Sequence, residues 1–98
     1  MSLNNGNYGA GQTPNATDVA TTTTEIAPAN DSRNWILLTN IGSTDVYISF
    51  DKNAELQKGI LLGANGGSLV LDKNVLTTGP INGITASGTN KVIYQEAI

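Results

Sequence analysis

The 98-residue sequence contains no cysteine and no histidine. Without cysteine the chain can form neither a disulfide nor a thiol nucleophile. Without histidine it lacks the Ser-His-Asp relay and the usual ligand of zinc and copper. A pair of carboxylates remains as a route to acid–base chemistry, but nothing in the sequence supplies such a pair with a positioned partner. The composition therefore argues against an enzyme, a metal centre and a bound cofactor.

Positive charge is scarce as well. Five Lys and Arg residues stand against eight Asp and Glu, which gives a net charge of −3. The cations are scattered and form no basic stripe, so we expect no nucleic-acid partner. No apolar run approaches the roughly 20 residues of a membrane span. The N-terminus has neither a positive start nor an apolar stretch, so we expect no signal peptide, no membrane partner, and synthesis in a cytoplasm.

What is present divides into two unequal parts. Residues 1–29 contain little that could build a core, whereas residues 30–98 are a series of short apolar runs separated by Gly and Asn turns. We interpret the first part as an extended N-terminal arm and the second as the folded body. A body of about 70 residues buries only about 60% of the surface of its unfolded chain. Because disulfides and zinc are excluded, oligomerisation or docking onto a larger surface is the remaining source of stability.

The arm has two segments of different character. Its first 14 residues are dominated by Gly and Asn, and Leu3 and Tyr8 are the apolar side chains suited to anchor it on a neighbour. The alternative is a terminus without fixed structure in the isolated protein. Residues 18–27 are rich in β-branched side chains and predict one strand, either at an edge of the body or added to a neighbour. Pro28 should end that strand, since proline cannot donate to a ladder.

The body begins with the most apolar run of the chain. Residues 33–40 predict a central strand, and residues 46–50 alternate strictly, which predicts a second strand with Tyr47 facing outward. The turn residues between the two runs predict that they pair as a hairpin.

Further strands follow at regular intervals. They are predicted at residues 59–62, 68–71, 81–87 and 91–96. The Gly-rich residues 63–67 predict a tight turn that pairs the first two of these strands. Strands that recur roughly every 8–12 residues between turns are typical of antiparallel sandwiches and barrels. We therefore predict an all-β fold, a small antiparallel β-sandwich of jelly-roll type with an extended N-terminal arm.

Two groups of residues suggest a ligand, and each also has a simpler interpretation. Asp45, Asp51 and Glu55 carry oxygen ligands, but the intervening loop has a Lys and lacks the Gly of a calcium loop, so we expect no metal. Trp35 and Tyr47 could stack on sugar rings if they shared an exposed face. The simpler interpretation is that they are core or interface aromatics.

The body resembles small structural proteins of tailed-phage virions from Arg33 to Glu96. The residues that carry the resemblance are Arg33-Asn34-Trp35-Ile36-Leu37-Leu38-Thr39-Asn40-Ile41-Gly42, Val46-Tyr47-Ile48, Gly59-Ile60-Leu61-Leu62, Gly66-Gly67-Ser68-Leu69-Val70-Leu71, and Ile84-Thr85-Ala86-Ser87-Gly88-Thr89 with Val92. They follow the scheme R-x-x-x-L-x-x-N-x-G, V-Y-I, G-I-x-L, G-G-S-L-x-L and I-x-A-S-G-T. Each piece alone is unspecific, and the order of the pieces is what resembles the family.

The resemblance implies a structural virion component, in particular a decoration or cement protein on the outer capsid surface. Such proteins commonly sit as homotrimers and tie capsomers together, so the implied partner is the major capsid protein. The arm is not part of the scheme, which keeps a glycan-binding module of a phage head fibre or tail fibre as the alternative. The resemblance includes no catalytic residue. We expect the contacts with capsid or sister protomer to come from Leu3, Tyr8, Val19, Thr21, Thr23, Ile26, Trp35 and Tyr47.

Overall fold

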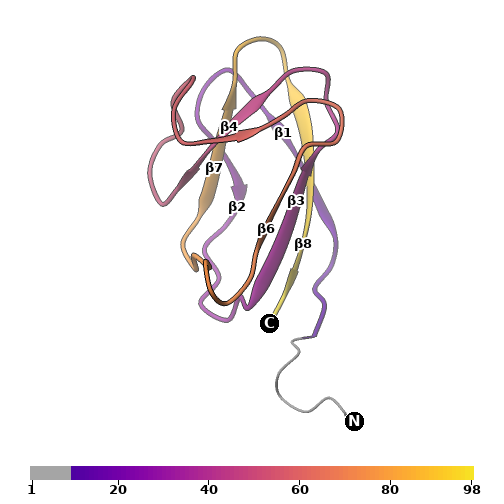
Figure 1. Cartoon of the computed structure of the whole chain (residues 1–98), viewed down its shortest axis with the longest axis vertical. Coiled ribbons are helices and arrows are strands. Elements are labelled where there is room, and N and C mark those ends of the chain that lie inside the picture. The colour runs from indigo at the N-terminus through magenta and orange to yellow at the C-terminus, as the bar shows by residue number, and fades with distance from the viewer. Residues whose placement is uncertain (1–9) are drawn as a thin grey trace.

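The protein is a sandwich of two antiparallel four-stranded sheets (Figure 1). The computed structural model describes residues 10–98, and over that range it contains strands and no helix. The strands are β1 (Asn15–Val19), β2 (Thr24–Ala27), β3 (Trp35–Asn40), β4 (Val46–Phe50), β5 (Ile60–Leu62), β6 (Ser68–Leu71), β7 (Ile81–Thr85) and β8 (Asn90–Ala97). Sheet A has the order β1-β8-β3-β6 and sheet B the order β2-β7-β4-β5. The predicted all-β sandwich is confirmed.

Strand pairing follows a nested order. β1 pairs with β8, β2 with β7, β3 with β6 and β4 with β5, in every case antiparallel. Pairing of β8 with β3 and of β7 with β4 then completes the two sheets. The chain is thus one long hairpin of eight strands, rolled so that its strand pairs alternate between two layers. That arrangement is a jelly roll, as the sequence predicted.

The two predicted hairpins are wrong. β3 belongs to sheet A and β4 to sheet B, and β5 and β6 are likewise in different sheets. Residues 41–45 and 63–67 therefore cross from one sheet to the other. Each of these strands carries one buried face, and consecutive strands bring those faces together across the core rather than pairing along their edges. Side-chain alternation is the same in both arrangements, so it could not distinguish them.

The predicted single strand over residues 18–27 is also wrong. β1 ends at Val19 and β2 begins at Thr24, with a turn between them. The Thr24 hydroxyl stabilises the turn, since it accepts a hydrogen bond from Ala20 N (3.1 Å) and donates one to Thr22 O (2.9 Å). The two halves of the segment form edge strands of different sheets.

Each strand supplies side chains to one core between the sheets. The core cluster is Val19, Ile26, Ala27, Ile36, Leu38, Val46, Ile48, Leu62, Leu71, Ile81, Val92 and Tyr94. Gly83 lies in the middle of β7 and faces inward, where an added Cβ would meet Ile26 and Val46. A glycine at this position lets the two layers approach closely. In the pairing of β2 with β7 the register shifts between Glu25 and Ala27.

Buried polar groups close the two ends of the sandwich. At the start of β3, the Arg33 side chain is buried and its Nε lies 2.5 Å from Glu96 Oε2. At the other end of β3, the Asn40 amide donates to Thr44 O (2.8 Å) and Leu62 O (3.0 Å). Asn90 donates to Thr85 Oγ1 (2.7 Å) in the same cluster. These hydrogen bonds compensate for the burial of the polar atoms and connect loops of both sheets.

Candidate docking surface

The outer face of sheet B is covered in part by the chain itself. The connection between β4 and β5, residues 51–59, is held there by two hydrogen bonds. Ala54 N donates to Thr23 Oγ1 (2.8 Å), and Asn82 Nδ2 donates to Lys52 O (2.8 Å). Ala54 and Ile84 are 5% and 9% exposed although neither belongs to the core between the sheets. The connection therefore shields apolar surface on this side.

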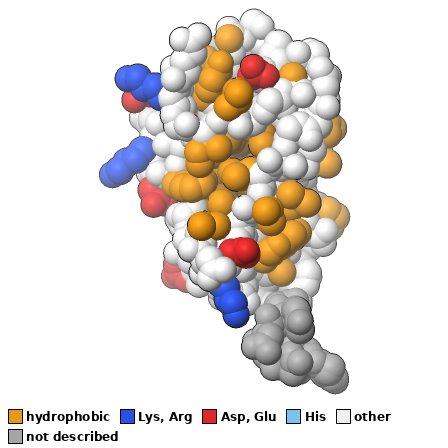
Figure 2. All heavy atoms as spheres, in the orientation of Figure 1, with side chains coloured by type: hydrophobic (Ala, Val, Ile, Leu, Met, Phe, Trp, Pro, Cys, Tyr) orange, Lys and Arg blue, Asp and Glu red, His pale blue; other side chains and the backbone are white. Residues whose placement is uncertain are grey.

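The outer face of sheet A stays open over the described residues. Three large apolar side chains on it, Leu37, Ile93 and Val70, are 36%, 39% and 50% exposed. In the view of Figure 2, hydrophobic side chains extend from the upper middle of the molecule to its lower right, where β3 and β8 lie. Contiguous apolar surface of this kind usually marks an interaction site in a soluble protein.

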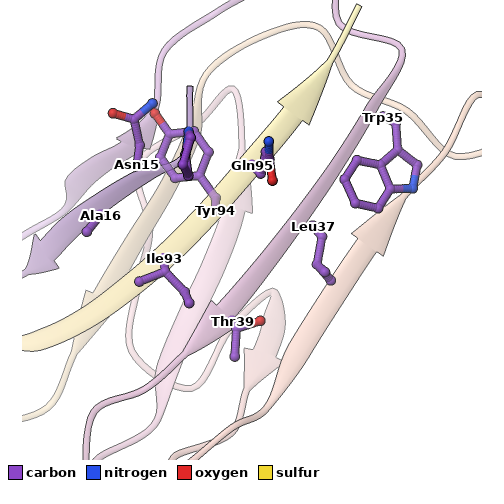
Figure 3. A pocket seen from close by; sticks show the side chains of 9 residues that line it. Asn15, Ala16, Trp35, Leu37, Thr39, Ile93, Tyr94 and Gln95 are labelled. Carbon is purple, nitrogen blue, oxygen red and sulfur yellow. The ribbon is translucent and has the colours of Figure 1, made fainter. Parts of the chain in front are cut away.

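A groove of about 470 Å³ is hollowed into this face. Its wall on β3 consists of Trp35, Leu37 and Thr39, which follow one another along the strand because alternate residues point to the same side (Figure 3). On β8, Ile93 lies opposite Thr39 and Gln95 opposite Leu37. The third wall comes from β1 and the residue before it: Pro14, Asn15 and Ala16. On the other side of β3, Val70 of β6 pairs with Leu37 and extends the apolar surface.

The groove is lined without a charged side chain. Its lining consists of Pro14, Asn15, Ala16, Trp35, Leu37, Thr39, Ile93, Tyr94 and Gln95. The charges on this face lie further along the strands, where Lys91 Nζ and Asp18 Oδ1 form an exposed ion pair at 3.0 Å. An apolar floor with neutral amides and hydroxyls and a charged rim is the usual composition of a binding interface.

Tyr94 lies beside the groove, although its side chain belongs to the core. Burial raises the pKa of the Tyr94 hydroxyl above its ordinary value of 10.0, and the Glu96 carboxylate adds to the increase. Arg33 opposes this change in pKa and Glu25 adds to it. The phenol is therefore neutral at physiological pH, in keeping with the uncharged lining.

Six of the eight predicted interface residues are described, and they lie in four different places. Leu3 and Tyr8 lie outside the described residues 10–98. Val19 and Ile26 are buried in the core, so their side chains face the interior of the sandwich and not a partner. Thr21 is exposed in the turn between β1 and β2.

The remaining predicted residues are not brought together. Thr23 lies in the same turn as Thr21, and its hydroxyl accepts the hydrogen bond from Ala54 N. Trp35 lies in the groove on sheet A, whereas Tyr47 lies on the outer face of sheet B, paired with Leu61 and Ile84. Because the two aromatic side chains are on opposite faces of the sandwich, they cannot form a shared platform for a sugar.

Sequence reasoning missed Leu37, Ile93 and Val70. A signal for the first was available, because Trp35-Ile36-Leu37-Leu38 is apolar at every position. In a two-layer sandwich each sheet has only one face toward the core, so a strand that is apolar at successive positions must place apolar side chains outside. The predicted central strand is confirmed, since β3 has a neighbouring strand on each side in sheet A.

The surface suits binding better than chemistry. Within residues 10–98 no group of three acidic side chains is placed to hold a metal ion. The same part of the chain has no helix long and apolar enough to cross a membrane. A narrow apolar groove with neutral hydrogen-bonding groups along its walls can accept an extended peptide or a flat, uncharged ring.

Comparison with known proteins found no matching family model, no matching curated protein and no matching solved structure.

Proposed function

We propose that this chain is a structural virion protein that decorates and stabilises a phage capsid. In this role it self-associates, as a homotrimer, and binds the major capsid protein on the outer capsid surface. The observation that carries the proposal is the open apolar face of sheet A, with Leu37, Ile93 and Val70 exposed beside an uncharged groove. A small protein gains stability by covering such a face with a partner.

The free energy gained by covering this face can be compared with the stability of a small domain. Full burial of a Leu, Ile or Val side chain contributes about 1.5–3 kcal/mol, and these three are already more than half buried on average. Covering the remainder therefore contributes on the order of 3 kcal/mol before the entropic cost of association. That is a large fraction of the free energy of unfolding of a small domain.

The choice of a capsid as the partner is supported by two further features. The jelly-roll topology occurs in viral capsid domains, although it occurs in lectins too. The ordered residue pattern from Arg33 to Glu96 favours a virion protein. Fold alone does not define function, so the pattern and the open face are the stronger supports.

Binding to capsids stripped of their decoration tests the proposal. We expect the protein to co-sediment with such capsids, and Val70→Asp to weaken the binding at least tenfold because it places a charge on the apolar face. The matched control is Leu61→Asp, a change at a 58% exposed position on the outer face of sheet B. Failure of the unmodified protein to bind, or equal binding by the Val70 variant, would contradict the proposal.

A glycan-binding module of a phage fibre is the second candidate, and one observation favours it. The Trp35 ring lies in the groove with the neutral polar groups of Thr39 and Gln95 nearby, an arrangement that can stack on a sugar and bind its hydroxyls (Figure 3). Binding on a glycan array that is lost in Trp35→Ala but kept in Tyr47→Ala would support this function. An array without any bound glycan would count against it.

A further inference from the structure

We infer that the groove on the outer face of sheet A holds residues 1–9 of a second copy of this chain. The inference rests on the proposed function, since it specifies how the protein self-associates. Four features of the described residues and of the sequence support it: where the arm leaves the fold, its direction there, its length, and the match in chemistry.

The point of departure is well defined. Gly11 forms a bridge with Ala97, and hydrogen bonds on either side of it extend the pairing. Ile98 N donates to Ala10 O (3.1 Å), and Gln12 N donates to Glu96 O (2.9 Å). Gln95, itself a groove residue, donates to Gln12 O (2.9 Å). The chain before Ala10 therefore starts from the end of β8, beside the groove.

The direction at that point leads away from the molecule's own groove. Residues 10–12 run antiparallel to β8, so at Ala10 the described chain points past Ala97 and Ile98. The groove lies the other way, at residues 93–95 of β8. To enter the groove of its own molecule the segment would have to reverse its direction, whereas the groove of a second copy can be reached without that reversal.

Residues 1–9 are long enough to reach the groove of a second molecule. Nine residues span up to about 30 Å when extended. The wall of the groove from Trp35 to Thr39 covers four residue steps, or about 13 Å along the strand. The segment can therefore follow the whole groove and still bridge about 15 Å between two molecules.

The chemistry of the segment matches that of the groove. Residues 1–9 read Met-Ser-Leu-Asn-Asn-Gly-Asn-Tyr-Gly, without a charged side chain, and the groove lining is uncharged too. Leu3 supplies an apolar side chain for the floor between Leu37 and Ile93. The Asn side chains can exchange hydrogen bonds with Gln95 and Asn15. No charged side chain is buried when the two meet, so the desolvation penalty of such a charge does not oppose the interface.

The fluorescence emission of Trp35 reports directly on the groove, because Trp35 is the one tryptophan of the chain and lines the groove. The test follows the full chain through a dilution series by Trp35 emission and by light scattering. We expect assembly and a shift of the emission to shorter wavelength to appear together as the concentration rises. Leu3→Asn should raise the concentration at the midpoint of both changes at least tenfold. The matched control, Leu61→Asn on the other sheet, should leave it unchanged.

Three outcomes would overturn the inference. One is a chain that stays monomeric with solvent-exposed Trp35 emission at every concentration. Another is an oligomer that is unaffected by Leu3→Asn. The third is a short-wavelength emission that depends on Leu3 but not on concentration, which would mean that the segment occupies the groove of its own molecule.

Capsid binding distinguishes this inference from the proposed function. If Leu3→Asn lowers self-association while the unmodified protein does not bind capsids, the capsid role fails and the groove assignment holds. If the unmodified protein binds capsids but Leu3→Asn leaves the oligomer intact, the groove assignment fails and the capsid role holds.

Discussion

At the scale of single residues, Arg33 and Asn40 hold opposite ends of the sandwich. The Arg33 guanidinium binds the Glu96 carboxylate and the carbonyl oxygens of Pro28, Thr77 and Gly79 at 2.7–2.9 Å. It thereby joins two connections between the sheets to β8. The contacts of Arg33 and Asn40 show that both side chains maintain the fold.

Replacement of Arg33 should be among the most destabilising single changes in the protein. Arg33→Met leaves the Glu96 carboxylate without its partner and removes the donor from three carbonyls, so the free energy of unfolding should fall by about 3–5 kcal/mol. Urea unfolding measures the change. The control is Lys91→Met, which breaks the exposed pair with Asp18 and should cost less than about 1 kcal/mol.

Arg33→Lys is the milder companion variant if the Met variant does not fold. It keeps the positive charge but cannot reach all four acceptors at once, so we expect an intermediate loss of stability. Equal stabilities of the Arg33 and Lys91 variants would show that the buried guanidinium does not maintain this end of the fold.

Tyr94 should make the protein sensitive to alkali. Because its pKa is raised in the folded state, the phenol ionises more readily in the unfolded chain. The free energy of unfolding should be independent of this group well below pH 10. It should fall as the pH rises from the ordinary pKa of 10.0 toward the higher folded-state value. Urea unfolding at pH values from about 8 to 11 should show the fall, and Tyr94→Phe should flatten it. An equally steep fall in the Phe variant would assign the alkali sensitivity to other groups.

At the scale of secondary-structure elements, the connections between strands do more than reverse the direction of the chain. Every connection except that between β4 and β5 passes from one sheet to the other. The connection from β3 to β4 packs against the start of β8, where Asn90 Oδ1 accepts a hydrogen bond from Thr44 N (3.1 Å). The connections thereby act as the end walls of the sandwich.

Gly42 should be sensitive to substitution for this reason. An added Cβ would overlap the Asn90 side chain, which is buried and held by its own hydrogen bonds. Gly42→Ala should therefore lower the free energy of unfolding by about 1–3 kcal/mol, the usual cost of overpacking. Gly63 is the control, since it also lies in a connection between sheets and a Cβ there meets nothing within 4 Å. Thermal or urea unfolding should show Gly63→Ala close to the unmodified protein, and an equal loss in both variants would refute the argument.

At the scale of the whole molecule, the outer faces of the two sheets differ in how far the chain itself covers them. The β4–β5 connection covers part of sheet B, whereas sheet A keeps a groove with large apolar side chains exposed around it. This difference is the reason for proposing sheet A, rather than sheet B, as the face that binds a partner.

The rolled-hairpin topology predicts slow folding. β1 pairs with β8 and β2 with β7, so most pairings join distant parts of the sequence, and only β4 and β5 are close. Because loop-closure entropy is lost before such contacts form, we expect refolding on the order of milliseconds to seconds. Stopped-flow refolding with Trp35 fluorescence measures the rate. Refolding within microseconds would indicate that the distant pairings do not limit folding.

Much of the local structure was predictable, and the pairing was not. Alternation in Val46–Phe50 and the runs at residues 60–62 and 68–71 located strands within a residue or two. The hairpins expected between them were wrong because a Gly- or Asn-containing turn permits either pairing or crossing. Of the site, the sequence indicates Trp35 but not Ile93, because the exposure of Ile93 depends on what covers sheet A.

The sequence by itself determined that this protein is built of β-strands and that each strand has a side suited to a core. It also excluded disulfides and histidine chemistry, since those depend only on which residues are present. Tertiary structure decided which strands pair, which apolar side chains remain outside, and that three strands meet to form a groove. The physical reason is that backbone hydrogen bonds are equally available to every strand. The partner of each strand follows from the closure of both layers around one core, which no short stretch of sequence contains.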